Sequence, residues 1–360
     1  MRIQFIIPFI NPTGGIRMVF EYANRLLERG HQASIFFPLF PYRFADRLTT
    51  PAGLRRWVGD LVLNLRHGAN APWFPLRVPL KMIPWVAGRW LPPADAIIAT
   101  AWPTAYDVAR LPATHGVPFY FIQGFEVWSG PAPAVEASYR LPLGQITVAS
   151  WLTRTLMERF GCAALDTIPY GVDTANFYPE GEIHPPTGRV LLQYHPLPIK
   201  GVADVLEAWE QVRAAWPAAQ LVMFGLEKGA DVPAFVEFHA NPSRDALRAL
   251  YNSCDIFVSP SWSEGCQLPP MEAMACRCAV VATNVGGIPD YAIAGQTAIV
   301  VEPHRPTELA EAIIHLLSDE AARRRVAEAG YQHIQQFTWE RAVERFEAAL
   351  KRGIQNNRGR

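Results

Sequence analysis

Two short apolar runs enclose a proline-containing segment between residues 255 and 283, and few folds accommodate that order. The first run, residues 255–259, ends in small polar residues, as a buried parallel strand does. Pro269 and Pro270 suit the first turn of a helix, where a missing N–H costs no hydrogen bond. Residues 279–283 form the next strand. Strand, loop, helix and strand predict half of a doubly wound α/β sheet.

The loop between these elements carries two glutamates at the place where such sheets bind ligands. Ligands bind beyond the carboxyl ends of parallel strands, and a helix that starts there directs free N–H groups at them. Glu264 lies in the loop, and Glu272 follows in the first helical turns. An ionised Glu accepts hydrogen bonds from sugar hydroxyls. A Glu at a helix start also stabilises the helix by capping it or through its dipole, so the residues alone leave both interpretations open.

The spacing of the glutamates is part of a longer pattern. Seven residues separate Glu264 from Glu272, Ala-Met-Ala follows the second, and the chain continues as VVATNVGGIPD. This stretch resembles the E-x7-E signature and the next loop of the family-4 (group 1) retaining nucleotide-sugar glycosyltransferases. The resemblance implies that Glu264 holds the transferred sugar and Glu272 the ribose hydroxyls of the donor. It also implies donor contacts from the intervening loop, namely from Gly265, Cys266, Gln267 and Leu268.

The stretch departs from the family pattern at four positions. The family usually has Phe and Gly where Cys266 and Gln267 stand, and Gly and Pro at Arg277 and Ala279. Backbone amides bind phosphate whatever side chain they carry. Gln267 therefore bears on the fit of the sugar more than on phosphate binding.

Length and composition exclude several classes of protein. The 360 residues suggest two domains of ordinary size, and a formal net charge of zero gives no general attraction to nucleic acid. The five cysteines lack a disulfide pattern, which favours a reducing, cytoplasmic compartment. We expect no zinc at Cys276 and Cys278, because no second Cys or His cluster lies nearby. We also expect no signal peptide and no membrane-spanning segment.

The first 37 residues predict a nucleotide-binding unit. Residues 3–7 read as a strand, residues 16–27 as a helix and residues 31–37 as a second strand, with Gly14 and Gly15 in the turn. Adjacent glycines let a backbone approach a phosphate, although a tight turn with positive φ also explains them. The segment resembles the start of the same glycosyltransferases, which implies that the glycines face the donor diphosphate and the acceptor. Arg17 either reaches a phosphate or is a solvated surface residue.

Residues 51–94 differ from the rest of the chain in charge and tryptophan content. Six basic residues and one acidic residue give a local charge of +5, and four Trp are interleaved with them. This composition suits an anionic membrane surface, a phosphate-bearing acceptor or, in principle, single-stranded nucleic acid. The alternative is a helical insertion whose Trp side chains pack on the sheet, because four prolines within residues 72–84 interrupt any long amphipathic helix. The residues are Arg55, Arg56, Arg66, Arg77, Lys81 and Arg89 with Asp60, and Trp57, Trp73, Trp85 and Trp90.

The strand at residues 117–123 ends in Gln-Gly-Phe-Glu. The family usually has a His beside the donor sugar at this place, and Gln123 stands there instead. A Gln can hydrogen-bond a hydroxyl but cannot take a proton, so no His-based acid–base role carries over. Gln123 with Glu126 and Trp128 is similar to the bacterial rhamnosyl-transferring members.

A second phosphate contact is predicted in the loop after residues 189–193. Lys200 precedes a Gly at a helix start and suits a diphosphate as a point charge, although most exposed Lys have no such role. The resemblance favours the phosphate role, because the family has an Arg and a Lys in this loop. His195 stands where the Arg is expected, so part of the clamp is weak or depends on pH. By the same resemblance, the nucleobase rests near Phe238 and His239.

These strand–helix series divide the chain into domains. We expect an amino-terminal Rossmann-like acceptor domain at 1–178, with the insertion at 51–94, and a Pro- and Gly-rich linker at 179–188. A donor domain at 189–335 and a helix at 336–360 that returns to the first domain complete the chain. Further strands are expected at 95–99, 145–150, 189–193, 220–225, 236–239 and 297–301, and further helices at 151–160, 202–215, 244–252, 307–317, 319–329 and 339–351.

The resemblance implies an α/β GT-B architecture, two facing Rossmann-like domains with a cleft between them. It implies transfer of a hexose or deoxyhexose from a nucleotide diphosphate sugar to a glycan or lipid-linked hydroxyl, with retention, as in polysaccharide or cell-envelope biosynthesis. Catalytic roles fall to Glu264, Lys200 and Gln123. With no Asp-x-Asp pair in the chain, we expect no metal and no cofactor besides the donor co-substrate. A non-catalytic nucleotide-sugar-binding or scaffold protein remains the alternative; no phosphorylase or epimerase motif is present.

Overall fold

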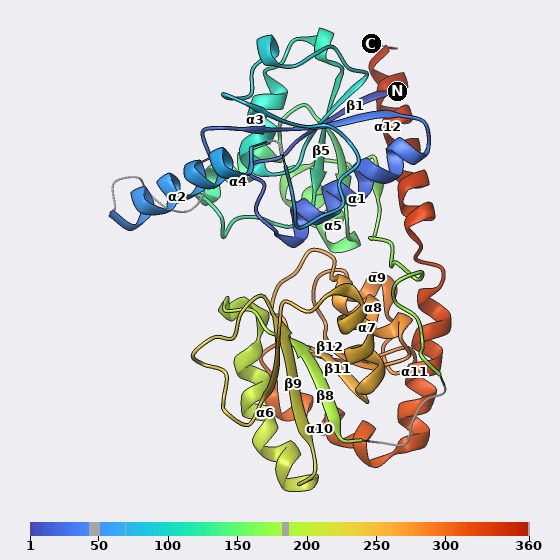
Figure 1. The fold of residues 1–360 in the computed structure, drawn as a ribbon. Coiled ribbons are helices and arrows are strands. Elements are labelled where there is room, and N and C mark those ends of the chain that lie inside the picture. The colour runs from blue at the N-terminus through green and yellow to red at the C-terminus, as the bar shows by residue number, and fades with distance from the viewer. Residues whose placement is uncertain (43–50, 69, 182–186, 359–360) are drawn as a thin grey trace. The chain divides into compact units, whose positions relative to one another are not determined.

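The computed structural model describes residues 1–42, 51–68, 70–181 and 187–358 (Figure 1). The chain forms two compact units, residues 1–168 with 340–360 and residues 169–339. Each unit is built on its own parallel sheet, as the sequence predicts. Part of the predicted linker, residues 182–186, lies outside the described residues.

The first unit contains a seven-stranded parallel sheet in the order β3-β2-β1-β4-β5-β6-β7. Its central strands are continuous apolar runs, which is typical of strands buried on both faces. The reversal of order at β1 brings the ends of β1 and β4 side by side, the usual position of a ligand in such sheets. The strands are β1 (Arg2–Ile6), β2 (Gln32–Pro38), β3 (Leu80–Ile83), β4 (Ala96–Ala99), β5 (Val117–Ile122), β6 (Gly144–Thr147) and β7 (Asp166–Thr167).

Helices pack around this sheet, and the last helix of the chain is one of them. Phe346 lies against Phe5, Tyr22 and Phe121, with ring centroids 4.6–6.2 Å apart, so α12 completes the core of the first unit. The predicted terminal helix therefore packs on the amino-terminal sheet. The helices of this unit are α1 (Gly14–Glu28), α2 (Pro51–His67), α3 (Trp102–Ala109), α4 (Ala132–Ser138), α5 (Ser150–Phe160) and α12 (Trp339–Arg358), with short 3-10 turns at η1 (Gly88–Trp90) and η2 (Ala113–His115).

The structure of residues 51–94 differs from the sequence-based expectation. They are not only a helical insertion, because β3 pairs in parallel with β2 and forms the edge of the sheet. The tryptophans do not all pack on the sheet either. Trp85 and Trp90 are 46% and 40% exposed, whereas Trp57 and Trp73 are half-buried.

The second unit contains a six-stranded parallel sheet in the order β10-β9-β8-β11-β12-β13. Both faces are covered: α6 and α10 pack on one face, and α7 and α8 pack on the other. The strands are β8 (Arg189–Gln193), β9 (Gln220–Gly225), β10 (Glu237–Ala240), β11 (Ile256–Ser259), β12 (Ala279–Thr283) and β13 (Ile299–Val301). The helices are α6 (Val202–Ala215), α7 (Arg244–Ser253), α8 (Leu268–Ala275), α9 (Ile288–Tyr291), α10 (Pro306–Ser318) and α11 (Glu320–Ile334), with η3 (Pro198–Lys200).

A buried ion pair fixes the amino-terminal end of this sheet. Asp255, just before β11, lies 2.9 Å from Arg323 of α11, and both side chains are almost fully buried. Asp255 also accepts hydrogen bonds from the backbone N–H groups of Thr187 and Arg189. A buried carboxylate needs such partners to remain ionised. These contacts hold the amino-terminal ends of β8 and β11 to α11.

All five cysteines are free thiols. Within the part of the chain that the structure describes, no helix is long and apolar enough to cross a membrane.

Candidate functional site

Three loops meet at the carboxyl edge of the second sheet, after the neighbouring strands β8, β11 and β12. The first two loops are locked together at Gly201, which has a positive φ of 66°. A Cβ atom there would lie 2.0 Å from the carbonyl oxygen of Pro260, so only glycine fits. The N–H of Trp262 also donates to the carbonyl of Ile199 at 2.7 Å. This packing holds Lys200 over the loop that contains Glu264.

Lys200 and Glu264, both predicted from the sequence, are in direct contact. Nζ of Lys200 lies 2.6 Å from Oε1 of Glu264, and the side chains are 29% and 15% exposed. The hydroxyl of Ser261 donates to the same carboxylate oxygen at 2.8 Å. The site therefore presents an ammonium group, a carboxylate and a hydroxyl within one hydrogen-bonded cluster, at an edge accessible to solvent.

The third loop supports the Glu264 loop from beneath. Gly286 has a φ of 61°, and a Cβ atom there would lie 2.8 Å from the carbonyl oxygen of Glu264. A Cβ atom at Gly287 would lie 3.2 Å from Cα of Cys266. The paired glycines of the VGG sequence thus let the two loops stack backbone on backbone.

His195 lies in the same region, after β8, but does not supply a second cation. Its Nδ1 accepts a hydrogen bond from the N–H of Leu197 at 3.1 Å. Burial, and then the neighbouring charge of Lys200, lower the pKa of His195 below its ordinary value of 6.5. The imidazole is neutral at neutral pH, so it can donate through Nε2–H but adds no positive charge.

The helix α8 begins at Leu268 directly after this loop, and among its first three residues only Leu268 carries a backbone N–H, because Pro269 and Pro270 lack one. Gln267 is the N-cap residue, and its side chain turns inward instead of capping the helix. The hydroxyl of Ser259 donates to Oε1 of Gln267 at 2.5 Å. Gly265 and Cys266 are half-buried, and burial raises the pKa of the Cys266 thiol to about 12, so it is not a thiolate.

Glu272 lies deeper than the other predicted residues. Its side chain is buried, and its Oε2 accepts a hydrogen bond from the hydroxyl of Tyr251 at 3.1 Å. Burial and the adjacent carboxylate raise the pKa of Tyr251 well above its usual value, so this tyrosine remains a donor. The Tyr251 contact orients Glu272 from α7, an arrangement that the sequence did not indicate.

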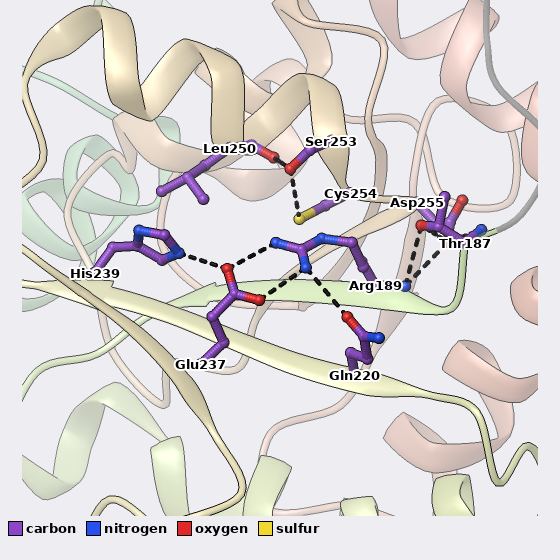
Figure 2. A network of polar contacts seen from close by, with 9 residues as sticks. All are labelled: Thr187, Arg189, Gln220, Glu237, His239, Leu250, Ser253, Cys254 and Asp255. Atoms are coloured by element: carbon purple, nitrogen blue, oxygen red, sulfur yellow. Dashed lines mark hydrogen bonds and ion pairs between the residues drawn. The ribbon is translucent and has the colours of Figure 1, made fainter.

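Phe238 and His239 point to opposite faces of β10, as neighbouring strand residues must. The Phe238 ring packs edge-on against Tyr194, with centroids 5.8 Å apart. Nε2 of His239 contacts Oε1 of Glu237 (Figure 2), and the two atoms are 2.6 Å apart. Both side chains are therefore engaged within the unit, and the backbone of β10 is the part left for the predicted nucleobase contact.

Glu237 is itself the centre of the network in Figure 2. Both of its oxygens accept hydrogen bonds from the Arg189 guanidinium, at 2.8 and 2.9 Å. This bidentate pair lowers the pKa of Glu237 to about 2. Arg189 also donates to Gln220 at 3.1 Å, so the network links the first residues of β8, β9 and β10.

The remaining predicted residues lie in the first unit. Gly14 and Gly15 open the helix α1 and do not form a separate turn, and neither has a positive φ, so the tight-turn interpretation is wrong. The side-chain amide of Gln123 lies 3.6 Å from the position that a Cβ atom of Gly15 would take, and the space around Gly14 is open. Arg17 is half-buried, on the first turn of α1.

The predicted site residues thus form two groups, one in each unit. Lys200, Glu264 and the start of α8 meet in the second unit, and Gly15 and Gln123 meet in the first. Sequence patterns missed Ser261, Tyr251 and the support from Gly286. Ser261 could have been noted because a hydroxyl three residues before a loop Glu comes within hydrogen-bonding reach where the loop turns tightly. Among the described residues, no group of three or more His, Cys, Asp or Glu is placed to hold a metal.

Residues 176–333, nearly the whole second unit, match the family model "Glycosyl transferases group 1". D-inositol 3-phosphate glycosyltransferase of Corynebacterium diphtheriae is 36% identical over 104 residues, which are 29% of this chain and 24% of that protein. The enzyme of the same name from an Arthrobacter species is 28% identical over 220 residues, 54% of this chain and 52% of that protein. The matches thus span about half or less of the length of these curated relatives.

Solved structures extend the likeness in fold to the whole chain. Anabaena HepE, solved in complex with UDP-glucose, superposes with a TM-score of 0.72 at 15% identity, covering 98% of this chain and 99% of HepE. Sucrose-phosphate synthase from Thermosynechococcus elongatus gives a TM-score of 0.71 at 16% identity, covering 98% of each chain. At this identity the likeness concerns the fold. The chain has the GT-B fold that its sequence predicts.

Proposed function

We propose that this protein transfers a hexosyl or deoxyhexosyl group from a nucleotide diphosphate sugar to a hydroxyl acceptor, with retention at the anomeric carbon. In this proposal Lys200 and the backbone N–H groups of Gln267 and Leu268, at the start of α8, bind the diphosphate. They stabilise the charge that develops on the leaving group, which is the main electrostatic task of such a transfer. Glu264 binds the hydroxyls of the transferred sugar and Glu272 those of the ribose.

The contact of Lys200 with Glu264 carries the proposal. It places a cation that can bind phosphate 2.6 Å from a carboxylate that can bind sugar hydroxyls, at the ligand edge of a group 1 glycosyltransferase unit. A nucleotide diphosphate sugar carries those two chemistries on neighbouring groups, the diphosphate and the sugar ring. Because HepE was solved with UDP-glucose, we propose a UDP-hexose as the first donor to test.

The acceptor in this proposal is a glycan or a lipid-linked glycan reached at a membrane surface. The helix α2 supports the membrane part (Figure 1). Leu54, Val58, Val62 and Leu65 are 40–58% exposed and recur at helical spacing, so they form one apolar stripe on the solvent side. On the other side, Asn64 donates to the backbone carbonyls of Pro38 and Leu39 and attaches the helix to the unit.

Positive charge lies beside this stripe. Arg55 and Arg66 are exposed. On a helical wheel drawn at about 100° per residue, they lie roughly 20–40° beyond the edge of the apolar stripe. Farther along the chain, Arg89 stacks on Trp85 and Trp90, with Cζ 4.7 and 5.0 Å from the ring centroids. Apolar side chains flanked by Arg suit the surface of an anionic bilayer. We therefore propose peripheral contact with an anionic membrane through α2.

Donor binding and turnover test the proposal directly. Thermal unfolding is measured with UDP-, GDP-, dTDP- and ADP-glucose, because a ligand that binds the folded chain raises its apparent stability. One of these donors should raise Tm more than its free nucleoside does. Release of nucleoside diphosphate is then followed with that donor, and proton NMR of the product identifies the anomer.

The outcomes separate the two functions that the sequence leaves open. Binding with release of nucleoside diphosphate and an α-linked product from an α-linked donor supports retaining transfer. Binding without any turnover, with lipid-linked and free glycan acceptors supplied, favours a nucleotide-sugar-binding protein. No stabilisation by any of the four donors contradicts the proposal.

A further inference from the structure

Glu126 lies in the loop after β5, at the carboxyl edge of the first sheet, and its carboxylate contacts the start of α3. Oε2 of Glu126 accepts a hydrogen bond from the backbone N–H of Trp102 at 2.9 Å. Trp102 is the first residue of α3, so this contact satisfies one of the N–H groups that every helix start leaves open. The contact fixes one oxygen of the carboxylate.

The loop that carries Glu126 is held by its own hydrogen bonds. The N–H of Glu126 donates to the hydroxyl of Tyr139 at 3.0 Å, and the carbonyl of Glu126 accepts from the N–H of Ser129 at 2.8 Å. The indole N–H of Trp102 donates to the hydroxyl of Ser129 at 3.1 Å. A Cβ atom at Gly130 would lie 2.6 Å from the Trp102 ring, so the loop packs directly on that indole. The loop conformation is therefore set before any ligand binds.

Two groups of this ordered loop remain available. Oε1 of Glu126 has no hydrogen-bond partner among the described residues, and the side chain is only half-buried. Trp128, two residues on, is 64% exposed, the largest exposed fraction of any tryptophan in the described chain. Capping of α3 explains why Oε2 of Glu126 contacts the start of that helix. It does not explain why the indole of Trp128, beside it, is exposed.

Carboxylate and indole together are suited to bind a carbohydrate. A carboxylate accepts hydrogen bonds from sugar hydroxyls, and an exposed indole face packs against the apolar C–H face of a sugar ring. A phosphate or uronic acid is disfavoured, because a second negative charge beside Glu126 costs electrostatic energy. Gln123, at the start of the same loop, adds an amide that can donate to or accept from a hydroxyl.

We propose that Glu126 and Trp128 bind a neutral sugar unit of the acceptor. This inference rests on the proposed glycosyl transfer and names the chemical class of its acceptor at this position. An anionic, lipid-linked acceptor is compatible with it if the phosphate lies elsewhere and an uncharged sugar occupies the Glu126 loop.

The protonation of Glu126 provides a readout that a merely structural residue would not give. Burial raises the pKa of Glu126 to about 7, and the hydrogen bond from Trp102 opposes this in part. The titratable groups against it are Tyr120 and Tyr139, whose pKa values are raised by burial and by Glu126 itself, so both stay neutral. Glu126 is thus the group here that changes charge between pH 6 and pH 8.

The test is saturation-transfer NMR on the full chain with UDP present. The probes are the methyl glycosides of glucose, galactose, mannose and rhamnose, with methyl glucuronide as the charged counterpart. We expect ring-proton signals from at least one neutral glycoside. Glu126→Gln should lose about tenfold in affinity, the size of one lost charge-assisted contact, and Trp128→Ala should lose a similar amount through the lost ring packing. Wild-type affinity should rise from pH 6 to pH 8, and Glu126→Gln should remove that rise.

Matched controls are Glu136→Gln, a carboxylate of the same unit that pairs with Arg159, and Phe235→Ala, an exposed aromatic residue of the second unit. Both should bind the glycosides as wild type does. Three results overturn the inference: unchanged binding in both test variants, a preference for methyl glucuronide, or no neutral glycoside bound by the wild type. Nucleoside diphosphate binding, measured alongside, separates the two proposals. Wild type that binds none of UDP, GDP, dTDP and ADP contradicts the proposed function, whereas binding of a nucleoside diphosphate with failed glycoside binding contradicts only the acceptor site.

Discussion

Nζ of Lys200 and Oε1 of Glu264 lie 2.6 Å apart, so two groups that we expect to bind different parts of the donor bind each other in the free chain. The side chains are 29% and 15% exposed, and solvent screening keeps the strength of such a pair near or below about 1 kcal/mol. A contact between the ammonium group and a diphosphate is also charge-assisted, and the diphosphate carries more negative charge than a single carboxylate. Exchange of the carboxylate for a diphosphate is therefore favourable, and the pair keeps Lys200 in place until the donor arrives.

Lys200→Ala should weaken binding of UDP far more than binding of uridine. The lost contact is a charge-assisted hydrogen bond of about 1.5–3 kcal/mol, which corresponds to roughly a 10- to 100-fold loss for the nucleotide. Uridine carries no phosphate and should bind with nearly unchanged affinity. Calorimetry with both ligands measures the difference, and equal losses for the two would remove Lys200 from the phosphate site.

Glu264→Gln should separate the diphosphate from the sugar. The substitution releases Lys200 from its ion pair, so free UDP should bind as tightly as to the wild type or up to several-fold more tightly. UDP-glucose should bind more weakly relative to free UDP than it does in the wild type, because a neutral amide accepts hydrogen bonds from sugar hydroxyls less strongly than a carboxylate. Calorimetry of both ligands on Glu264→Gln, Lys200→Ala and the double variant gives the coupling between the residues. Parallel losses of UDP and UDP-glucose in Glu264→Gln would contradict the assignment.

Glu272→Ala should reduce the preference for a ribonucleotide over its 2′-deoxy analogue. It should also lower the free energy of unfolding by about 1–3 kcal/mol, because the buried hydroxyl of Tyr251 loses its acceptor. Tyr251→Phe is the matched control: it removes the same hydrogen bond and leaves the carboxylate. Competition between UDP and 2′-deoxy-UDP measures the preference. If Glu272→Ala keeps the full preference, Glu272 is a structural residue of α8.

The Arg189–Glu237 pair predicts a pH-dependent contribution to stability (Figure 2). Arg189 holds the pKa of Glu237 near 2, below its ordinary value of 4.5, so the folded state binds this proton less readily than the unfolded state. The stabilisation is present above about pH 4.5 and is lost as the pH falls towards 2. Because Glu237 is 42% exposed, we expect only about 1 kcal/mol from it.

Urea unfolding of Glu237→Gln and of wild type should therefore differ at pH 7 and converge as the pH is lowered below 4. The exposed Glu308, 3.9 Å from Arg305, provides the control, and Glu308→Gln should change stability by less than about 0.5 kcal/mol at any pH. A difference for Glu237→Gln that stays constant from pH 7 to pH 3 would show that its charge is not what stabilises β10.

The elements that the sequence predicted best are buried ones. The bounds of β8, β9, β12 and α6 agree with the expected ranges, because uninterrupted apolar runs and helical spacing directly reflect burial on the sheet. β3 was missed, since Leu80–Ile83 is a four-residue edge strand between two prolines and carries a Lys. Its strand structure comes from pairing with β2, which no local pattern records.

The same limit applies to the site. The E-x7-E pattern identified Glu264, and the loop chemistry identified Lys200, but the two are 64 residues apart in the chain. Their contact follows from the adjacency of β8 and β11, which is a property of the sheet order. The Tyr251–Glu272 contact likewise joins helices on either side of β11 in the chain. Motifs therefore indicated candidate residues, and only the fold could show which of them are in contact.

Residues 51–94 give the last prediction, which concerns membrane contact. The apolar stripe of α2 should bind vesicles that contain anionic lipid, with the neighbouring Arg55 and Arg66 adding on the order of 1 kcal/mol each near the surface. Arg77 is a poorer choice for a test than its position in the sequence suggests, because it pairs with Glu28. Val58→Asp with Val62→Asp should abolish binding by placing charge within the stripe. Arg55→Gln with Arg66→Gln should weaken binding at low salt and remove most of its salt dependence.

Flotation with vesicles of neutral or mixed anionic lipid, at low and at physiological salt, measures these effects. The control is Met157→Asp, which adds a charge at an exposed apolar residue of α5 in the same unit and should float as wild type does. Donor binding should be equal in all variants, since α2 belongs to the first unit and the Lys200–Glu264 cluster to the second. Wild type that fails to float with anionic vesicles even at low salt would contradict membrane contact. Flotation that persists in the double Asp variant would show that α2 is not the surface that binds the membrane. The next surface to test would then be Trp85 and Trp90, whose exposed rings flank Arg89.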